Sequence, residues 1–268
     1  MNRTAEKIPI VLAAFGTTSK AIETYSFIDD IVKKRFPGHE ILWSYSSRMV
    51  KERIKKKNNI ELKHPHQVLK ELNDLGYGWA VVQSLHLMCG HEFYRLVDEA
   101  GECDIRTSIG LPLLHSPPDY KNLLANLDYL IPSGRNEAAV FIGHGTDHPA
   151  WTAYASLFNM LRESGRLNTY VGVVEHGHTS MEKIINEVTL AGYKHVLLIP
   201  LMLVAGVHFI EDMYGNEDSW KTAFESRDIT VSAEQKGLGM NPGIIEIFCS
   251  HIQDALDVIP LQALPDNL

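Results

Sequence analysis

The sequence has few cysteines and no excess of positive charge. Its 268 residues include only three cysteines, Cys89, Cys103 and Cys249, and none of them forms a CxxC pair. This odd count and wide spacing exclude a disulfide framework and a cysteine-based zinc knuckle. The formal net charge is -8 at pH 7, so the protein as a whole does not attract nucleic acid, and we expect no nucleic-acid partner.

Long apolar runs are missing as well. No segment is long and apolar enough to span a bilayer, so we expect no membrane association. The apolar run at 8–15 is short, has no signal-peptide cleavage pattern and leads into an amphipathic helix. We interpret it as the first strand of a cytoplasmic protein.

Common phosphate-binding and nucleophile motifs are also absent. The chain has no GxSxG elbow and no P-loop, and the glycine-rich stretch at 237–243 lacks the strand-then-GxGxxG order of a dinucleotide-binding loop. We therefore predict no organic cofactor.

Strand-like and helix-like segments alternate along the chain. Short continuous apolar runs, typical of strands buried on both faces, are followed by apolar residues spaced for one face of a helix. The predicted strands lie at 8–15, 40–45, 79–86, 104–110, 138–144, 169–175, 195–203 and 228–234. This order predicts an α/β fold with parallel sheets.

The second half of the chain repeats the first. "FGT" at 15–17 aligns with "HGT" at 144–146, and "ELNDLGYGWAVVQSL" at 71–85 aligns with "EVTLAGYKHVLLIPL" at 187–201. Several identities in one register favour an internal duplication over the convergence of two similar units. We predict two flavodoxin-like lobes, each with a doubly wound parallel sheet, over residues 1–133 and 134–268.

The lobes are predicted to join near 130–138, where Pro, Ser and Gly gather. Ligands of such sheets bind beyond the carboxyl ends of the strands, so the strand ends of two related lobes can face one cleft. A last helix, predicted within 241–259, could pack on its own lobe or cross to the first.

The duplication allows the strand ends of the two lobes to be compared. We align Phe15, Trp43 and the loop with Glu92 in the first lobe with His144, Glu175 and His208 in the second. Two imidazoles and one carboxylate suit a divalent ion such as Co, Fe, Ni or Zn. We predict that the three side chains of the second lobe converge on one metal site, opposite an aromatic wall from the first lobe.

Each of these three residues also has a structural interpretation. His144 could be a core histidine with a satisfied ring, and His208 could cap the helix that follows it. Glu175 ends an apolar strand, where a carboxylate needs a partner. Their occurrence at equivalent strand ends favours the metal site.

Five motifs carry a resemblance to a known family. They are "LAAFGTTS" at 12–19, "QSLHLMCGHEF" at 83–93, "FIGHGTDHPAWTAY" at 141–154, "VEHGH" at 174–178 and "PLMLVAGVHFIEDM" at 200–213. With these motifs the sequence resembles the class II tetrapyrrole chelatases, and more closely the anaerobic sirohydrochlorin cobaltochelatases of the CbiK type. The resemblance extends over nearly the whole chain.

The resemblance implies the class II chelatase fold and insertion of Co²⁺ into sirohydrochlorin, or its precorrin form, on the oxygen-independent route to cobalamin. The metal is then a substrate, and Fe²⁺ stays an alternative because ferrochelatases for sirohaem are common among the relatives. The family's His, Glu, His metal site falls on His144, Glu175 and His208. The expected partners are sirohydrochlorin and Co²⁺, and the sequence also allows a homo-oligomer.

Metal insertion requires that two pyrrole protons leave the macrocycle. His144 is a candidate acceptor as well as a ligand, because a histidine titrates near neutral pH. Glu92 is a second candidate, with the alternative that it stabilises the start of a helix near Phe93.

The remaining predicted substrate contacts lie at strand ends. Phe15 and Trp43 could bend the macrocycle, and the backbone N–H groups of helix starts after Gly16 and Gly145 could bind its carboxylates. The cationic candidates are Arg48, Arg95 and Lys236.

Two functions of other classes compete with a chelatase. One is a non-enzymatic two-lobe protein that binds a metal or a tetrapyrrole without turnover. The other is a metal hydrolase, which fits less well because no second carboxylate cluster suggests a two-metal site.

Overall fold

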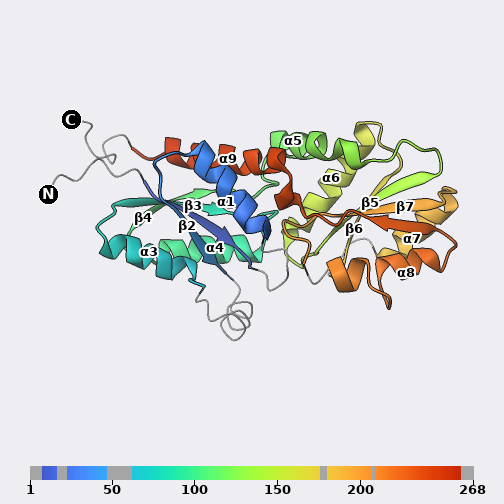
Figure 1. Ribbon diagram of the computed structural model, residues 1–268, viewed down its shortest axis with the longest axis horizontal. Coiled ribbons are helices and arrows are strands. Elements are labelled where there is room, and N and C mark those ends of the chain that lie inside the picture. The colour runs from blue at the N-terminus through green and yellow to red at the C-terminus, as the bar shows by residue number, and fades with distance from the viewer. Residues whose placement is uncertain (1–7, 17–22, 47–61, 176–179, 207–208, 261–268) are drawn as a thin grey trace. The chain divides into compact units, whose positions relative to one another are not determined.

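The computed structural model describes residues 8–16, 23–46, 62–175, 180–206 and 209–260, and contains two parallel four-stranded sheets (Figure 1). The first sheet has the order β2-β1-β3-β4 and the second the order β6-β5-β7-β8. The strands are β1 (Ile10–Ala14), β2 (Ile41–Tyr45), β3 (Trp79–Ser84), β4 (Arg106–Gly110), β5 (Glu137–Gly143), β6 (Thr169–Val173), β7 (His195–Pro200) and β8 (Thr230–Ala233). The predicted pair of doubly wound α/β sheets is confirmed.

Helices connect the strands, as parallel pairing requires. They are α1 (Glu23–Arg35), α3 (Pro65–Asp74), α4 (His91–Gly101), α5 (Pro117–Leu127), α6 (Thr152–Glu163), α7 (Met181–Leu190), α8 (Trp220–Glu225) and α9 (Pro242–Asp257). A short π-helix, η4, spans Phe209–Met213. Among the helices of the described segments, none is long and apolar enough to cross a membrane.

Successive residues of the central strands pack on opposite faces of each sheet. In the first sheet, Val11 of β1 packs in a cluster with Leu69 of α3 and Leu96 of α4, while α1 and α9 lie on the other side (Figure 1). In the second sheet, Val140 of β5 packs with Val188 of α7. Complete burial of each such side chain stabilises the fold by about 1.5–3 kcal/mol.

The strand registers support the internal duplication. Ile10 pairs with Val81 in the first sheet, and Ala139 pairs with Leu197 in the second. These four residues are equivalent in the alignment of 15–17 with 144–146 and of 71–85 with 187–201. The two halves of the chain therefore share strand order and register as well as sequence.

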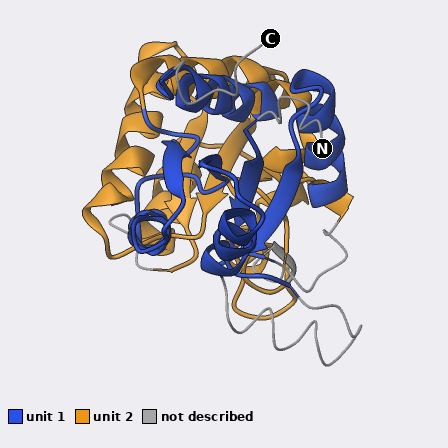
Figure 2. Ribbon diagram, turned by 90° about the vertical axis from the view of Figure 1, so that its left-hand side faces the viewer, with its two compact units in different colours: residues 1–18, 25–115, 245–268 blue, residues 19–24, 116–244 orange. Residues whose placement is uncertain are grey.

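The chain forms two compact units, and each of them combines segments that are not continuous in the sequence (Figure 2). Unit 1 comprises residues 1–18, 25–115 and 245–268, and unit 2 comprises residues 19–24 and 116–244. These limits differ from the predicted lobes 1–133 and 134–268, because the segment with α5 belongs to unit 2 and most of α9 belongs to unit 1. The ring of His251 in α9, for example, is hydrogen-bonded through Nδ1 to the carbonyl of Leu111, which follows β4 (2.9 Å).

Candidate functional site

His144 follows the buried strand β5 directly. The strand is covered on both faces up to Gly143, whereas the side chain of His144 is exposed. A β-carbon on Gly143 would lie 2.4 Å from Cε1 of Tyr154 in α6, so only glycine allows this approach. The sequence thus places an imidazole where the polypeptide leaves the core.

Glu175 is joined to His144 through the backbone. The N–H of Glu175 donates to the carbonyl of His144 (2.8 Å), and the N–H of Val174 donates to that of Gly143 (3.0 Å). These two bonds continue the pairing of β5 with β6 beyond the strands. His144 and Glu175 therefore lie next to each other, just after the ends of two adjacent strands. Both side chains are exposed.

Gly145 allows the turn after His144 to approach the backbone of Glu175 closely. Its φ of +95° is a conformation that side-chain-bearing residues rarely adopt, and a β-carbon there would lie 1.6 Å from the carbonyl oxygen of Glu175. Its N–H donates to the hydroxyl of Tyr154 (3.2 Å). The turn after His144 is therefore fixed by contacts to β6 and to α6.

His208, the third predicted ligand, lies outside the described residues. The segment before it is anchored, because Leu201 donates to the carbonyl of Ile142 (2.8 Å) and Met202 accepts from Leu238 (2.8 Å). Within the described segments, which omit 176–179 and 207–208, no three His, Cys, Asp or Glu side chains form a metal-binding group. Convergence of the three residues stays a prediction.

Phe15 occupies the position in unit 1 that His144 has in unit 2. It follows β1, and its side chain is 47% exposed. Gly16, which comes next, has a φ of +101°, close to that of Gly145. An aromatic side chain thus stands on the same kind of turn that carries the imidazole in unit 2.

The predicted equivalence of Trp43 and Glu175 is wrong. Trp43 pairs with Leu12 in the middle of β1 and β2, and the matching pair in the second sheet is Val171 with Phe141. The indole N–H of Trp43 donates to Asp29 of α1 (2.9 Å). The repeat has little sequence identity in this part of the chain, so the sequence alone does not fix where the second strand of the first sheet ends.

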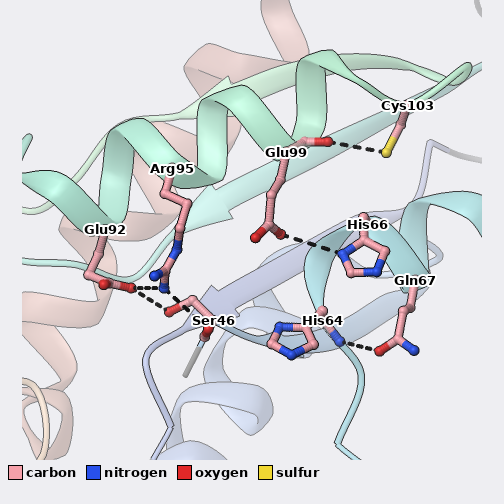
Figure 3. Close-up of polar contacts among 8 residues, drawn as sticks. All are labelled: Ser46, His64, His66, Gln67, Glu92, Arg95, Glu99 and Cys103. Atoms are coloured by element: carbon pink, nitrogen blue, oxygen red, sulfur yellow. Dashed lines mark hydrogen bonds and ion pairs between the residues drawn. The ribbon is translucent and has the colours of Figure 1, made fainter. Parts of the chain in front are cut away.

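Glu92 lies in the first turn of α4 and takes part in a three-residue polar network (Figure 3). Its Oε2 accepts from the hydroxyl of Ser46 (2.9 Å) and forms an ion pair with Arg95. Arg95 also donates to the carbonyl of Ser46 (3.2 Å), which is the residue after β2. The network holds the Glu92 carboxylate at the carboxyl end of the first sheet, and Arg95 is engaged there instead of being a free cation. Arg48 lies outside the described residues.

His86 is a half-buried group at the same edge that sequence reasoning passed over. It follows β3, and its Nδ1 is hydrogen-bonded to the hydroxyl of Ser84 (2.8 Å). Burial, reinforced by the charge of Arg95, lowers the pKa of His86 to about 4. The ring is therefore neutral at pH 7. The sequence feature that pointed to His86 is its position within the 83–93 motif.

A family model described as cobalt chelatase (CbiK) matches residues 9–257. The sirohydrochlorin cobaltochelatase of Salmonella typhimurium is 35% identical over 227 residues, which is 83% of this chain and 85% of the relative. The sirohydrochlorin cobaltochelatase CbiKC of Nitratidesulfovibrio vulgaris is 33% identical over 263 residues, covering 93% of this chain and 91% of the relative.

Solved structures show the same fold. SirB from Bacillus subtilis with Fe³⁺ has a TM-score of 0.63 at 16% identity and covers 93% of this chain and 95% of its own. The sirohydrochlorin chelatase SirB from Bacillus subtilis subspecies spizizenii in complex with cobalt has a TM-score of 0.62 at 14% identity, covering 97% and 100%.

Proposed function

Because the chain belongs to the cobalt chelatase (CbiK) family, we propose that it inserts Co²⁺ into sirohydrochlorin, on the oxygen-independent route to cobalamin. The observation that carries this function is the near-full-length match to two sirohydrochlorin cobaltochelatases above 30% identity. Both the metal and the tetrapyrrole are substrates, and the metallated macrocycle and two protons are the products.

The proposed metal site lies in unit 2 and consists of His144, Glu175 and His208. The backbone hydrogen bond from Glu175 to His144 supports the first two as a pair. An ion held by three side chains keeps open coordination positions, which the incoming pyrrole nitrogens need. Once the ion has passed to the macrocycle, the freed imidazole of His144 is able to take a pyrrole proton.

Phe15 and the backbone N–H groups that follow Gly16 and Gly145 are the proposed contacts for the macrocycle; the N–H of Gly145 itself is bound to Tyr154, and the residues directly after Gly16 lie outside the described part of the chain. The exposure of Phe15 supports this role, since a large apolar side chain at a strand end gains by covering the face of a ring. The mid-strand position of Trp43, with its N–H bound to Asp29, gives no such support. The cytoplasmic location and a homo-oligomer stay predictions.

Turnover distinguishes an enzyme from a binding protein. Catalytic amounts of protein mixed with excess sirohydrochlorin and Co²⁺ are expected to give many equivalents of the metallated absorbance spectrum, faster than spontaneous insertion. A non-enzymatic binder would instead saturate at one equivalent. Parallel assays with Fe²⁺ test the ferrochelatase alternative, which a faster reaction with iron would favour.

We also propose that Glu92 accepts a pyrrole proton, and Glu92→Gln tests this. The variant keeps the size of the side chain and its contact with Ser46 but removes the charge. Turnover is expected to fall about 100-fold, the lower range for loss of a general base, with little change in melting temperature. Glu99→Gln, a charge removal later in the same helix, is the matched control and should retain turnover. Unchanged insertion by Glu92→Gln across the pH range would assign Glu92 to helix stabilisation alone.

A further inference from the structure

Both units contain the same contact between a tyrosine and the glycine that follows the first strand. In unit 2, Gly145 donates its N–H to the hydroxyl of Tyr154, in the first turn of α6. In unit 1, the backbone of Gly16 is hydrogen-bonded to the hydroxyl of Tyr25, in the first turn of α1. Since both glycines have a positive φ, the duplicated units share one way of shaping the turn after the strand.

The hydroxyl groups accept these bonds as neutral groups. Burial raises the pKa of Tyr154 and of Tyr25, so neither phenol ionises at neutral pH. A neutral hydroxyl oxygen can accept the glycine N–H without placing a negative charge beside the strand end. The contact is therefore a fixed positioning element over the whole range in which an imidazole titrates.

In unit 2 the tyrosine contacts the residues on both sides of His144 in the sequence. The ring of Tyr154 packs against Gly143, where a β-carbon would lie 2.7 Å from the hydroxyl oxygen, and the same hydroxyl binds the N–H of Gly145. Both residues adjacent to His144 therefore touch one side chain. With the bond from Glu175 to its carbonyl, the backbone of His144 is held from two directions, while its ring is left exposed.

We propose that Tyr154 is a positioning residue that fixes the direction of the His144 imidazole toward the metal, and that Tyr25 fixes Phe15 in the same way. This inference rests on the proposed function, because it assigns Tyr154 to the metal substrate through His144. The two units use the same scaffold to present different side chains, an imidazole in one and an aromatic ring in the other.

The pair Tyr154→Phe and Tyr25→Phe tests the assignment. Each variant removes one hydroxyl from the same structural contact and keeps the ring, so both should lose similar small amounts of thermal stability. Tyr154→Phe is expected to weaken Co²⁺ binding, measured by calorimetry without tetrapyrrole, about tenfold, as is typical when support for a metal ligand is lost. Its KM for Co²⁺ should rise more than its kcat falls. Tyr25→Phe should leave Co²⁺ affinity unchanged and raise the KM for sirohydrochlorin.

A double-mutant cycle excludes a merely structural effect. If Tyr154 acts through His144, Tyr154→Phe adds nothing to the loss of Co²⁺ affinity in a His144→Ala background. Additive losses, or equal losses of Co²⁺ affinity in Tyr154→Phe and Tyr25→Phe, would overturn the positioning role. If His144→Ala itself binds Co²⁺ normally, the proposed metal site fails, which is a different result.

Amide hydrogen exchange can be measured on the unaltered protein, so this test does not require any variant to fold. Because coupling is reciprocal, bound Co²⁺ should slow exchange at the Gly145 amide and leave the Gly16 amide unaffected. Equal effects at the two amides, or none at either, would count against the proposal.

Discussion

The His144→Ala variant is expected to lose nearly all cobalt insertion while it keeps its fold. The side chain is exposed beyond the end of β5, so its removal opens no cavity. The proposed reaction loses one of three metal ligands and a candidate proton acceptor, and the expected fall in turnover is on the order of 10²–10⁴-fold. The measurement is the initial rate of cobalt insertion, corrected for the spontaneous reaction, together with calorimetric Co²⁺ affinity.

His148→Ala is the matched control, since His148 lies in the same segment after β5. Its Nδ1 accepts from the N–H of Ala150 (3.1 Å), a local contact at the start of a short 3-10 helix, Pro149–Trp151. This variant should change turnover only slightly. Near-normal turnover in His144→Ala would refute the role of His144 as ligand.

Gly145→Ala is expected to reduce cobalt insertion about 100-fold, because displacement of a reacting group by about 1 Å is enough for such a loss. The new β-carbon would lie 1.6 Å from the carbonyl oxygen of Glu175. The backbone of the turn must therefore move away from β6, which separates His144 from Glu175. The assay is cobalt insertion, with Co²⁺ affinity measured in parallel.

Gly192→Ala separates this effect from ordinary backbone strain. Gly192 also has a positive φ, +81°, but nothing lies within 4 Å of its added β-carbon. The left-handed conformation costs alanine roughly 1–2 kcal/mol at either site, so both variants should lose stability. Only Gly145→Ala should lose Co²⁺ affinity; the same loss in Gly192→Ala would mean that general destabilisation, and not the contact with Glu175, is responsible.

Much of the fold could be predicted because buried parallel strands leave a clear pattern. Runs such as 138–142 are apolar without interruption, and all eight predicted strands overlap observed ones. Helix α8 has no clear sequence signal, because its six residues are too few to show a period. In α5, by contrast, Tyr120, Leu123 and Leu127 have helical spacing. The unit to which α9 belongs could not be decided, since its apolar face suits either sheet.

The candidate site was predictable where the two halves share several identities in one register. The alignment of Phe15 with His144 is supported by the strand registers, whereas that of Trp43 with Glu175 failed where identities are few. The same alignment sets Tyr25 equal to Tyr154, so the shared tyrosine can also be found in the sequence. What sequence alone could not supply is distance, such as the approach of Gly145 to Glu175, because it depends on how β5 and β6 pair.

The membership of α9 in unit 1 determines the order in which the protein can fold during synthesis. Strands β1 to β4 leave the ribosome first, but Phe248 and Ile252, which are buried in α9, are made only after β8. Most of unit 2, residues 116–244, is by contrast continuous in the chain. The unit that begins the polypeptide is therefore the last to be completed, and the face of its sheet that α1 and α9 share has only α1 on it while the other unit is translated.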